Sequence, residues 1–300
     1  MSNIKIQKPV IKWVGGKTQI IKEVMIRFPS TMENYHEIFL GGGSVLFALL
    51  SYKKAGLINI QNKIYVYDIN KLLINLYKNI QNNKDDLYVY IDKYFKEYSN
   101  IDTNKGNKKP NSLEEAKTSK ESYYYWIRNK FNLIDKESIE CSALFMFINK
   151  TCFRGMYREG PNGFNVPFGH YVSLKNIIDK TELDFISVFI KDVEFIHSDF
   201  SDSINKVGIN DFVYLDPPYT QEKDKKSFLG YVNDGFNNDL QLKLFNMTKS
   251  LKDSKFLMSN SNADLVKDSF KDYNCDEIKA RRAINSLNPG STTKELLIYN

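Results

Sequence analysis

Four segments of the chain combine β-branched and aromatic residues and then stop at a polar side chain. They run from Lys63 to Asp68, from Val193 to Asp199, from Asp211 to Asp216 and from Lys255 to Ser259. Short apolar runs of this composition are typical of strands. Because stretches of helical periodicity separate them, the pattern predicts an α/β sheet that is largely parallel. The functional edge of such a sheet lies at the carboxyl ends of its strands.

The middle of the chain interrupts this alternation. From about residue 82 to residue 120 the sequence is rich in Lys, Asn, Asp and Tyr, and a helical pattern resumes at Tyr123. We interpret this part as an insertion that is mainly helical. Within it, the polar stretch near residues 100–118 is typical of a disordered surface loop.

Composition limits the class of protein. The chain has 300 residues and a formal net charge of +6, and 42% of its residues are hydrophobic, which suffices for one folded core with an insertion. The basic excess permits a polyanionic partner, but it also fits a surface that only maintains solubility. Cys141, Cys152 and Cys275 show no CxxC or Cys/His spacing, so we expect a reducing compartment and no structural metal. No signal-peptide or membrane-spanning run is present in this sequence, so we expect an intracellular protein.

The first chemical signal is a strand-like segment that begins at His36 and runs into Gly41-Gly42-Gly43, followed by the apolar pattern VLFALL. Glycine allows a tight turn and lets the backbone approach a ligand closely. Alone, such a turn serves many nucleotides and sometimes none. Asp68, at the end of the next strand, could accept hydrogen bonds from both hydroxyls of a ribose. Together the two features favour a cofactor that contains adenosine.

A competing motif lies earlier in the chain. Gly15-Gly16-Lys17-Thr18 looks like the end of a phosphate-binding loop, but the full pattern needs a glycine where Ile11 stands. An NTPase is therefore disfavoured. Near the amino terminus, Lys17 could instead meet the carboxylate of a cofactor's amino-acid tail.

The strongest motif is Asp216-Pro217-Pro218-Tyr219, which follows the apolar strand DFVYL. Two prolines force a rigid exit from the sheet and leave the Asp216 carboxylate and a proline carbonyl facing a pocket. Two neighbouring acceptors suit one NH2 group. Accepting both N6 hydrogens of adenine localises charge on that nitrogen as it attacks a sulfonium methyl group. The alternative is a plain turn bounded by prolines.

Tyr219 could stack on the adenine, which has to leave the double helix to reach such a site. We expect direct transfer with no covalent intermediate on the enzyme. We expect His36 and His197 to have structural or surface roles.

At this point the chain resembles the Dam-like family of DNA adenine-N6 methyltransferases, in which the recognition insert precedes the DPPY motif. The resemblance covers nearly the whole chain, through Lys12–Lys17, Phe39–Gly43, Asp68 and Asp216–Tyr219. It implies a doubly wound, mostly parallel, Rossmann-like methyltransferase sheet with an inserted helical domain. It also implies S-adenosyl-L-methionine as the cofactor and no metal. The cofactor-binding residues would be Trp13, Gly16, Lys17, Phe39, Gly41, Gly43, Asp68, Asp199, Phe200 and Asp216.

The predicted domains follow from this resemblance. Residues 1–81 and 185–300 would form the catalytic domain, and residues 82–184 would form the DNA target-recognition insert. The catalytic residues would be Asp216, Pro217, Pro218 and Tyr219. The partner would be double-stranded DNA, and a restriction endonuclease could be a genetic rather than a physical partner. The protein would act where that DNA lies, in the cytoplasm or nucleoid of a prokaryote or in an infected cell.

The segment from Asn149 to Tyr171 resembles the part of the family that reads the target. Arginine suits the paired acceptors of guanine, and aromatic rings suit stacking or intercalation. For any one arginine, a phosphate contact or a surface ion pair is an equal alternative. Arg158 falls where the family's guanine-reading arginine falls, whereas Arg154 replaces the asparagine usual in the Dam branch. A GATC site and a related palindrome such as CATG therefore both stay open.

The candidate DNA contacts lie in this segment and in the basic run near the carboxyl end. For that basic run, a solvated basic face is an equal alternative to phosphate binding. The candidates are Phe153, Arg154, Met156, Arg158, Asn165, Pro167, His170, Tyr171, Arg281 and Arg282.

Other functions use similar motifs. A methyltransferase acting on RNA or on a protein amide could use the same proline-proline-tyrosine turn, and the segment from Asn149 to Tyr171 argues against it. A binding module without catalysis would be expected to lose either DPPY or the glycine turn, and both are present. Transfer to cytosine N4 shares the geometry, and the whole-chain resemblance disfavours it.

Overall fold

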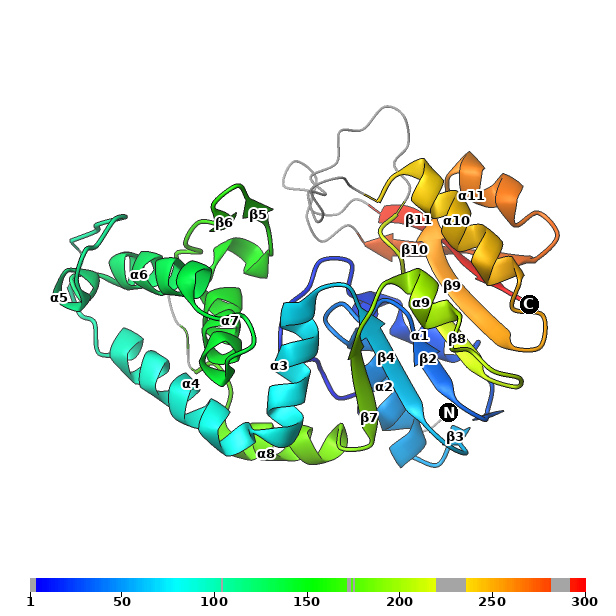
Figure 1. The fold of residues 1–300 in the computed structure, drawn as a ribbon, viewed down its shortest axis with the longest axis horizontal. Coiled ribbons are helices and arrows are strands. Elements are labelled where there is room, and N and C mark those ends of the chain that lie inside the picture. Colours follow the sequence, from blue (N-terminus) through cyan, green and yellow to red (C-terminus); the bar gives the residue numbers. More distant parts are fainter. Residues whose placement is uncertain (1–3, 104, 172–173, 175, 220–235, 282–291) are drawn as a thin grey trace. The chain divides into compact units, whose positions relative to one another are not determined.

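The computed structural model describes residues 4–103, 105–171, 174, 176–219, 236–281 and 292–300, without the side chains of 280, 281, 292 and 293. The chain forms two compact units, each described by itself below (Figure 1). Unit 1 comprises Met1–Lys8, Lys17–Ile69 and Asp192–Asn300, and unit 2 comprises Pro9–Gly16 and Asn70–Lys191.

Unit 1 contains a seven-stranded sheet with the order β10-β11-β9-β8-β2-β4-β7. Strands β9, β8, β2, β4 and β7 pair in parallel, whereas β11 and β10 are antiparallel additions at one edge. The strands are β2 (Tyr35–Glu37), β4 (Ile64–Asp68), β7 (Val193–His197), β8 (Phe212–Leu215), β9 (Lys255–Ser261), β10 (Asn274–Arg281) and β11 (Thr292–Tyr299). The predicted strands are confirmed within two residues at each end, and the sheet is mostly parallel, as expected.

The order of the strands creates a switch point beside β2. The chain moves from β2 to β4 and β7 on one side, then returns to β8 and β9 on the other side. Between β4 and β7 it leaves the sheet at Ile69 and comes back at Asp192, so all of Asn70–Lys191 interrupts one crossover. Ligands of open α/β sheets bind at the carboxyl ends of the strands beside such a switch. The topology thus places a candidate site between β2 and β8.

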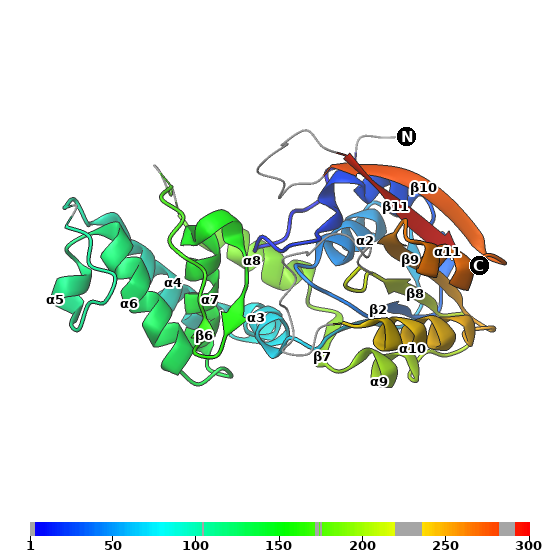
Figure 2. The ribbon, with the colours of Figure 1, turned by 90° about the horizontal axis from the view of Figure 1, so that it is seen from above.

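Helices cover both faces of this sheet. In Figure 2, α2 (Ser44–Lys54) lies on the opposite side of the strands from α9 (Phe200–Ile204) and α10 (Asn238–Lys249). Phe245 of α10 contacts Phe270, which follows α11 (Asp264–Ser269), with the ring centroids 5.1 Å apart. These rings share a buried core with Val213 and Met258 from the neighbouring strands. Because strand side chains alternate between faces, the apolar runs supply both cores.

The other face of the sheet is built around Phe28, which follows α1 (Ile21–Met25). Its ring lies 4.7 Å from that of Phe212 and 5.9 Å from those of Tyr35 and Tyr214. Smaller elements of unit 1 are η1 (Lys17–Gln19) and the parallel pair β1 (Thr31–Met32) and β3 (Asn59–Ile60).

A buried polar network joins the central strands of unit 1. The Asp211 carboxylate accepts hydrogen bonds from His36 Nε2 (2.9 Å) and from both nitrogens of Asn34 (3.0 and 2.7 Å). Burial lowers the pKa of His36, with Asp211 opposing that decrease, so the ring is neutral near pH 7. Nε2 donates to Asp211, and Nδ1 therefore accepts from the Tyr67 hydroxyl, 3.2 Å away. The structural role expected for His36 is confirmed.

Unit 2 is mainly helical, with a short antiparallel hairpin. Its elements are α3 (Lys71–Asn82), α4 (Lys84–Ser99), α5 (Leu113–Ala116), α6 (Lys120–Leu133), α7 (Ile139–Thr151), η2 (Phe153–Gly155), β5 (Glu159–Gly160), β6 (Gly163–Phe164) and α8 (Lys180–Phe189). Serine caps begin α5, α6 and α7, where Ser112 Oγ accepts from Glu115 N, Ser119 Oγ from Ser122 N and Ser138 Oγ from Cys141 N. The central helix is α7, which is buried from Cys141 to Asn149.

The disorder expected near residues 100–118 is wrong for the described part of that stretch. Ser112 caps the short helix α5, and Thr118 fastens the loop because its carbonyl accepts from Lys105 N at 3.1 Å. The Thr118 hydroxyl donates back to the Lys105 carbonyl at 3.0 Å. Local hydrogen bonds of Ser and Thr to the backbone order a polar segment that composition alone assigns to a mobile loop.

The division into domains predicted from the sequence, with boundaries at residues 81 and 185, stays a prediction. The compact units divide instead after Ile69 and Lys191, and they place Pro9–Gly16 with the helical unit. No helix among the described residues is long and apolar enough to cross a membrane.

The polar network predicts a measurable cost for losing its acceptor. Replacing Asp211 by alanine leaves the buried donor of His36 and the partly buried donors of Asn34 without a partner, so the free energy of unfolding should fall by about 3 kcal/mol or more. Urea denaturation measures this loss. The matched substitution Asp272→Ala, at an exposed position, should change the free energy by less than about 0.5 kcal/mol. Equal values for the two variants would show that the network contributes nothing.

Candidate active site

Carboxylates line the carboxyl edge of the central strands. Glu37 ends β2, Asp68 ends β4, and Asp216 directly follows β8. Because β8, β2 and β4 are neighbours in parallel register, with Glu37 opposite both Tyr214 and Val66, the three acids follow one another along this edge. The fold therefore brings the motifs predicted at positions 41–43, 68 and 216–219 to one edge of the sheet.

The glycine turn has the conformation that the sequence requires of it. Gly41 has a φ of 51° and Gly43 a φ of 79°, values that favour glycine. The Gly41 amide donates to Asp68 Oδ2 at 2.8 Å, which ties the turn to the end of β4. Gly43 then precedes α2, where the Ser44 hydroxyl accepts from Lys17 N at 3.0 Å.

Lys17 and Asp216 form an ion pair. Lys17 Nζ lies 2.7 Å from Asp216 Oδ2, and the two side chains are 5% and 19% exposed. Burial raises the pKa of Asp216 to about 6, Lys17 limits the increase, and the charge of Glu295 adds to it. The cation predicted for the cofactor tail and the acid predicted for catalysis are thus direct neighbours.

Tyr219 is held from two sides. Its hydroxyl donates to Glu295 Oε2 at 2.8 Å, and Lys17 Nζ lies 4.9 Å from the centre of its ring. Burial raises the pKa of Tyr219 well above its ordinary value, so its hydroxyl stays protonated and donates. Within the same turn, the carbonyl of the preceding residue, Pro218, accepts a hydrogen bond from Gln241 Nε2 at 2.5 Å.

An aromatic cluster lies beside the glycine turn. Phe39 and Phe200 are stacked with their centroids 6.2 Å apart, and Phe236 meets both rings edge-on at 6.1 and 5.7 Å. Asp199 caps α9 by accepting from Ser201 N at 2.8 Å. Sequence reasoning found Phe39, Asp199 and Phe200 but missed Phe236, since no motif marks that position.

Sequence reasoning also missed Glu37. It is 1% exposed, and Tyr35 donates to its Oε2 at 2.8 Å. Burial raises the pKa of Glu37 well above its ordinary value, and the charges of Asp216 and Asp68 add to the increase. The available signal was an acid four residues before the glycine turn, in a segment that continues into the apolar residues Ile38, Phe39 and Leu40.

Trp13 belongs to unit 2. Its ring lies 5.4 Å from that of Tyr157 and 6.3 Å from that of Phe145. Asn149 fixes the neighbouring backbone, because its Oδ1 accepts from Lys12 N at 2.9 Å and its Nδ2 donates to Lys12 O at 2.8 Å. Gly16 closes the segment, with its amide 3.3 Å from the Trp13 carbonyl. The roles predicted for Trp13 and Gly16 in cofactor binding stay predictions.

The predicted recognition residues share one loop system in unit 2. The segment after α7 pairs with the segment after β6, through Phe153 N to Pro167 O (2.8 Å) and Gly169 N to Thr151 O (2.8 Å). Most of the candidate side chains on these segments are exposed, and Met156 and Arg158 are partly buried. The exposed candidates are Phe153, Arg154, Asn165, Pro167, His170 and Tyr171.

Arg158 is oriented within this loop system. Its Nε donates to Asn165 Oδ1 at 2.6 Å, across the β5–β6 hairpin. Arg154 has a φ of 57° and lies over the Phe153 ring at 5.2 Å, and His170 has a φ of 51°. Positive φ values at residues other than glycine store backbone strain, which is common at functional loops.

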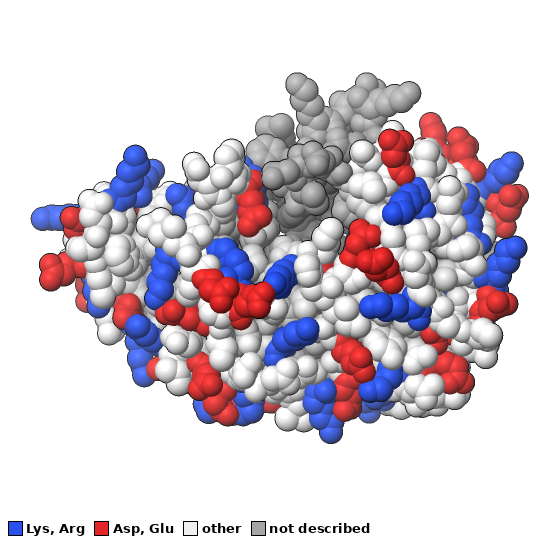
Figure 3. Space-filling model, in the orientation of Figure 1, with Lys and Arg blue, Asp and Glu red and all other residues white. Residues whose placement is uncertain are grey.

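Two predicted DNA contacts cannot be placed. Arg281 ends β10, but its side chain and the whole of Arg282 lie outside the described residues. On the face drawn in Figure 3, described basic and acidic side chains are interspersed, so the net charge of +6 does not form one patch there.

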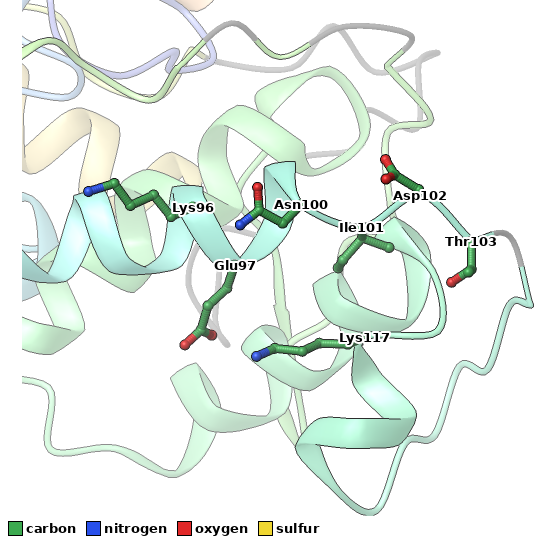
Figure 4. A pocket seen from close by; sticks show the side chains of 7 residues that line it. All are labelled: Lys96, Glu97, Asn100, Ile101, Asp102, Thr103 and Lys117. Atoms are coloured by element: carbon green, nitrogen blue, oxygen red, sulfur yellow. The ribbon is translucent and has the colours of Figure 1, made fainter.

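A pocket of about 460 Å³ lies elsewhere in unit 2, at the end of α4 (Figure 4). Charged and polar side chains line it, with Lys117 extending toward Glu97, and none of the predicted site residues is among them. The lining residues are Lys96, Glu97, Asn100, Ile101, Asp102, Thr103 and Lys117. Within the described ranges, no group of three or more His, Cys, Asp or Glu residues could hold a metal ion.

Comparison with known proteins identifies the family. A family model described as D12 class N6 adenine-specific DNA methyltransferase matches residues 13–284. The chain is 33% identical to the type II methyltransferase M.MjaIII of Methanocaldococcus jannaschii, over 98% of this chain and 99% of that protein. It is 31% identical to the type II methyltransferase M1.LlaDCHI of Lactococcus lactis subsp. cremoris, over 98% and 95%.

A third relative carries a different name from the two type II methyltransferases. The chain is 27% identical to a DNA adenine methylase of Haemophilus influenzae, over 96% of this chain and 91% of that protein. The family model and these relatives cover nearly the whole sequence, including the glycine turn, Asp68 and the Asp216–Tyr219 motif. The chain belongs to the D12 class of N6 adenine-specific DNA methyltransferases.

Proposed function

We propose that this adenine-N6 methyltransferase modifies one adenine within a short palindromic site of double-stranded DNA, either GATC or CATG. The observation that carries the proposal is the Lys17–Asp216–Tyr219 arrangement at the carboxyl end of β8, beside the glycine turn of β2. It combines an acceptor for an amino group with an aromatic ring, at the switch point where α/β sheets bind their ligands.

The residues at this edge fit S-adenosylmethionine, the methyl donor of the family. The glycine turn presents backbone without side chains, and the partly exposed Asp68 offers acceptors for ribose hydroxyls. The cluster of Phe39, Phe200 and Phe236 offers flat apolar surfaces for an adenine ring. When bound, the cofactor supplies an electrophilic methyl group.

Asp216 would hold the target amino group. The Pro218 carbonyl already accepts one hydrogen bond, from Gln241, and we take the Pro217 carbonyl as the acceptor that pairs with Asp216. If these two oxygens accept both N6 hydrogens, the nitrogen lone pair is withdrawn from the ring and directed out of its plane. Lys17 would keep the Asp216 carboxylate ionised and oriented, and Tyr219 would stack on the displaced base.

We assign target reading to the loop system after α7 in unit 2. Arg158, held by Asn165 across the hairpin, would read a guanine, and the exposed Phe153 and Tyr171 would stack on or wedge between bases. Arg154 occupies the position that bears on the choice between GATC and CATG. Arg281 and Arg282 would contact phosphates.

The type II methyltransferases among the relatives support a further part of the proposal. This chain would protect DNA at a site that a restriction endonuclease cuts, and the endonuclease would be a genetic partner rather than a bound one. Digestion of plasmid DNA from cells that express the chain tests this, because protection should be confined to enzymes that cut the modified site.

Loss of Asp216 should abolish methyl transfer. We predict that Asp216→Ala lowers the rate by about 100-fold or more, measured with radiolabelled S-adenosylmethionine on duplexes that contain GATC, CATG or neither. Mass spectrometry should find N6-methyladenine in one of the two sites only. The control Asp202→Ala, exposed on α9, should behave as wild type. Equal labelling of all three duplexes would reject a specific palindrome, and an active Asp216→Ala enzyme would reject the catalytic role.

The raised pKa of Asp216 predicts a pH dependence. Only the ionised form of Asp216 accepts its share of the N6 hydrogens well, and burial raises the pKa of Asp216 to about 6 in the free protein. The ratio kcat/KM should therefore fall by about tenfold between pH 7 and pH 5, since the ionised fraction falls with pH below that pKa. Circular dichroism at each pH checks that the fold persists. A profile that stays flat down to pH 5 in folded protein would contradict this role.

The arginines of the recognition loops predict two different losses. Arg158→Ala should reduce discrimination at one base pair by about 1–3 kcal/mol, measured as the ratio of affinities for matched and mismatched duplexes. If Arg154 contacts phosphate, Arg154→Ala should weaken binding to every duplex. The slope of log K against the logarithm of the salt concentration should then decrease in magnitude by about one. If Arg158→Ala weakens all duplexes equally, Arg158 contacts phosphate and the assignment to guanine fails.

A further inference from the structure

The catalytic turn cannot be anchored in the usual way. Backbone loops are commonly fixed through amide N–H donors, but Pro217 and Pro218 have none. The turn also leaves the sheet, because β8 ends at Leu215. Its shape therefore depends on its carbonyl groups and on the side chains at its two ends.

Gln241 supplies one anchor. It lies in the first part of α10 and is 0% exposed, and its Nε2 donates to the Pro218 carbonyl at 2.5 Å. The amide orientation is fixed, since a rotated amide would place Oε1 against that carbonyl oxygen. Among the described residues, Oε1 has no hydrogen-bond partner. A position that served only the core would be better filled by an apolar side chain than by a buried amide with one bond.

Glu295 supplies the second anchor. It lies on β11, where it pairs with Ser261 of β9, and its Oε2 accepts from the Tyr219 hydroxyl at 2.8 Å. A carboxylate so near Asp216 is electrostatically unfavourable, because the charge of Glu295 raises the pKa of the catalytic acid. Its position beside that acid is explained if it fixes the ring of Tyr219.

We propose that Gln241 and Glu295 are positioning residues that hold the Asp216–Tyr219 turn in its catalytic shape. Gln241 holds the Pro218 carbonyl, and with it the orientation of the adjoining Pro217 carbonyl, the proposed acceptor beside Asp216. Glu295 sets the plane of Tyr219 against which the displaced adenine stacks. The inference rests on the proposed roles of Asp216 and Tyr219, and it extends them to two residues outside the motif.

The test compares variants that differ in one bond. Gln241→Leu removes the donor at similar volume, Glu295→Leu removes the acceptor, and Glu295→Gln keeps an acceptor oxygen for Tyr219. Asn246→Leu, exposed on the same helix α10, is the matched control. For each variant we would measure kcat, KM for duplex DNA, affinity for S-adenosylhomocysteine and thermal unfolding. The fluorescence of 2-aminopurine at the target position reports how the displaced base is stacked.

The expected result is a loss confined to the chemical step. Gln241→Leu and Glu295→Leu should lower kcat by about tenfold to a hundredfold, with affinity for S-adenosylhomocysteine within about twofold of wild type. Glu295→Leu should also change the 2-aminopurine signal, whereas Glu295→Gln should restore both the rate and the signal. Asn246→Leu should match wild type in every measurement.

A double-mutant cycle isolates the bond between Tyr219 and Glu295. Tyr219→Phe removes the hydroxyl, so adding Glu295→Leu should cost less than about a further twofold in kcat. Additive losses would overturn the role of Glu295, and an unchanged kcat in folded Gln241→Leu would overturn that of Gln241. If Asp216→Ala remains active, the proposed function itself fails. If Asp216→Ala is inactive while the Gln241 and Glu295 variants are fully active, only the present inference fails.

Discussion

The parallel register of β8, β2 and β4 is the constraint on which the site depends. Parallel neighbours end at the same edge of a sheet, so residues far apart in sequence, such as Glu37 at the end of β2 and Asp216 after β8, are brought together there. The reversal of strand order beside β2 opens that edge to a ligand. The long excursion of residues 70–191 between β4 and β7 leaves the register intact, which explains how one sheet can carry so large an insertion.

At this edge, burial favours the protonated form of Asp216, whereas the proposed chemistry needs its carboxylate. Burial raises the pKa of Asp216, and a protonated acid would be a poor acceptor for an amino group. The adjacent Lys17 limits this increase, whereas the charge of Glu295 adds to it, and Glu295 also accepts from Tyr219. On the same sheet, Asp211 and the neutral His36 form a network that serves the fold. The two acids have opposite pKa shifts, because hydrogen bonds from Gly208, Asn34 and His36 outweigh burial at Asp211, whereas at Asp216 burial and the charge of Glu295 outweigh Lys17 and Tyr219.

Much of the fold and the centre of the site could be predicted from the sequence. Apolar runs that stop at an acid, as at Asp68, mark both the strands and their functional ends, since the two properties are local. Contacts that depend on distant packing could not be predicted. Nothing in the sequence links Gln241 to Pro218 or Phe236 to Phe39, and the ordering of residues 100–118 depends on hydrogen bonds from Thr118 that composition does not show.

The central claim is that the carboxyl edge of β2, β4, β7 and β8 binds the cofactor. Hydrogen–deuterium exchange with and without S-adenosylhomocysteine tests it most directly, because peptides across the whole chain report at once. The account predicts slower exchange in residues 37–45, 66–70, 197–203 and 214–219, with little change around the pocket of Lys96 and Lys117. Protection centred on that pocket, with none along the sheet edge, would contradict it.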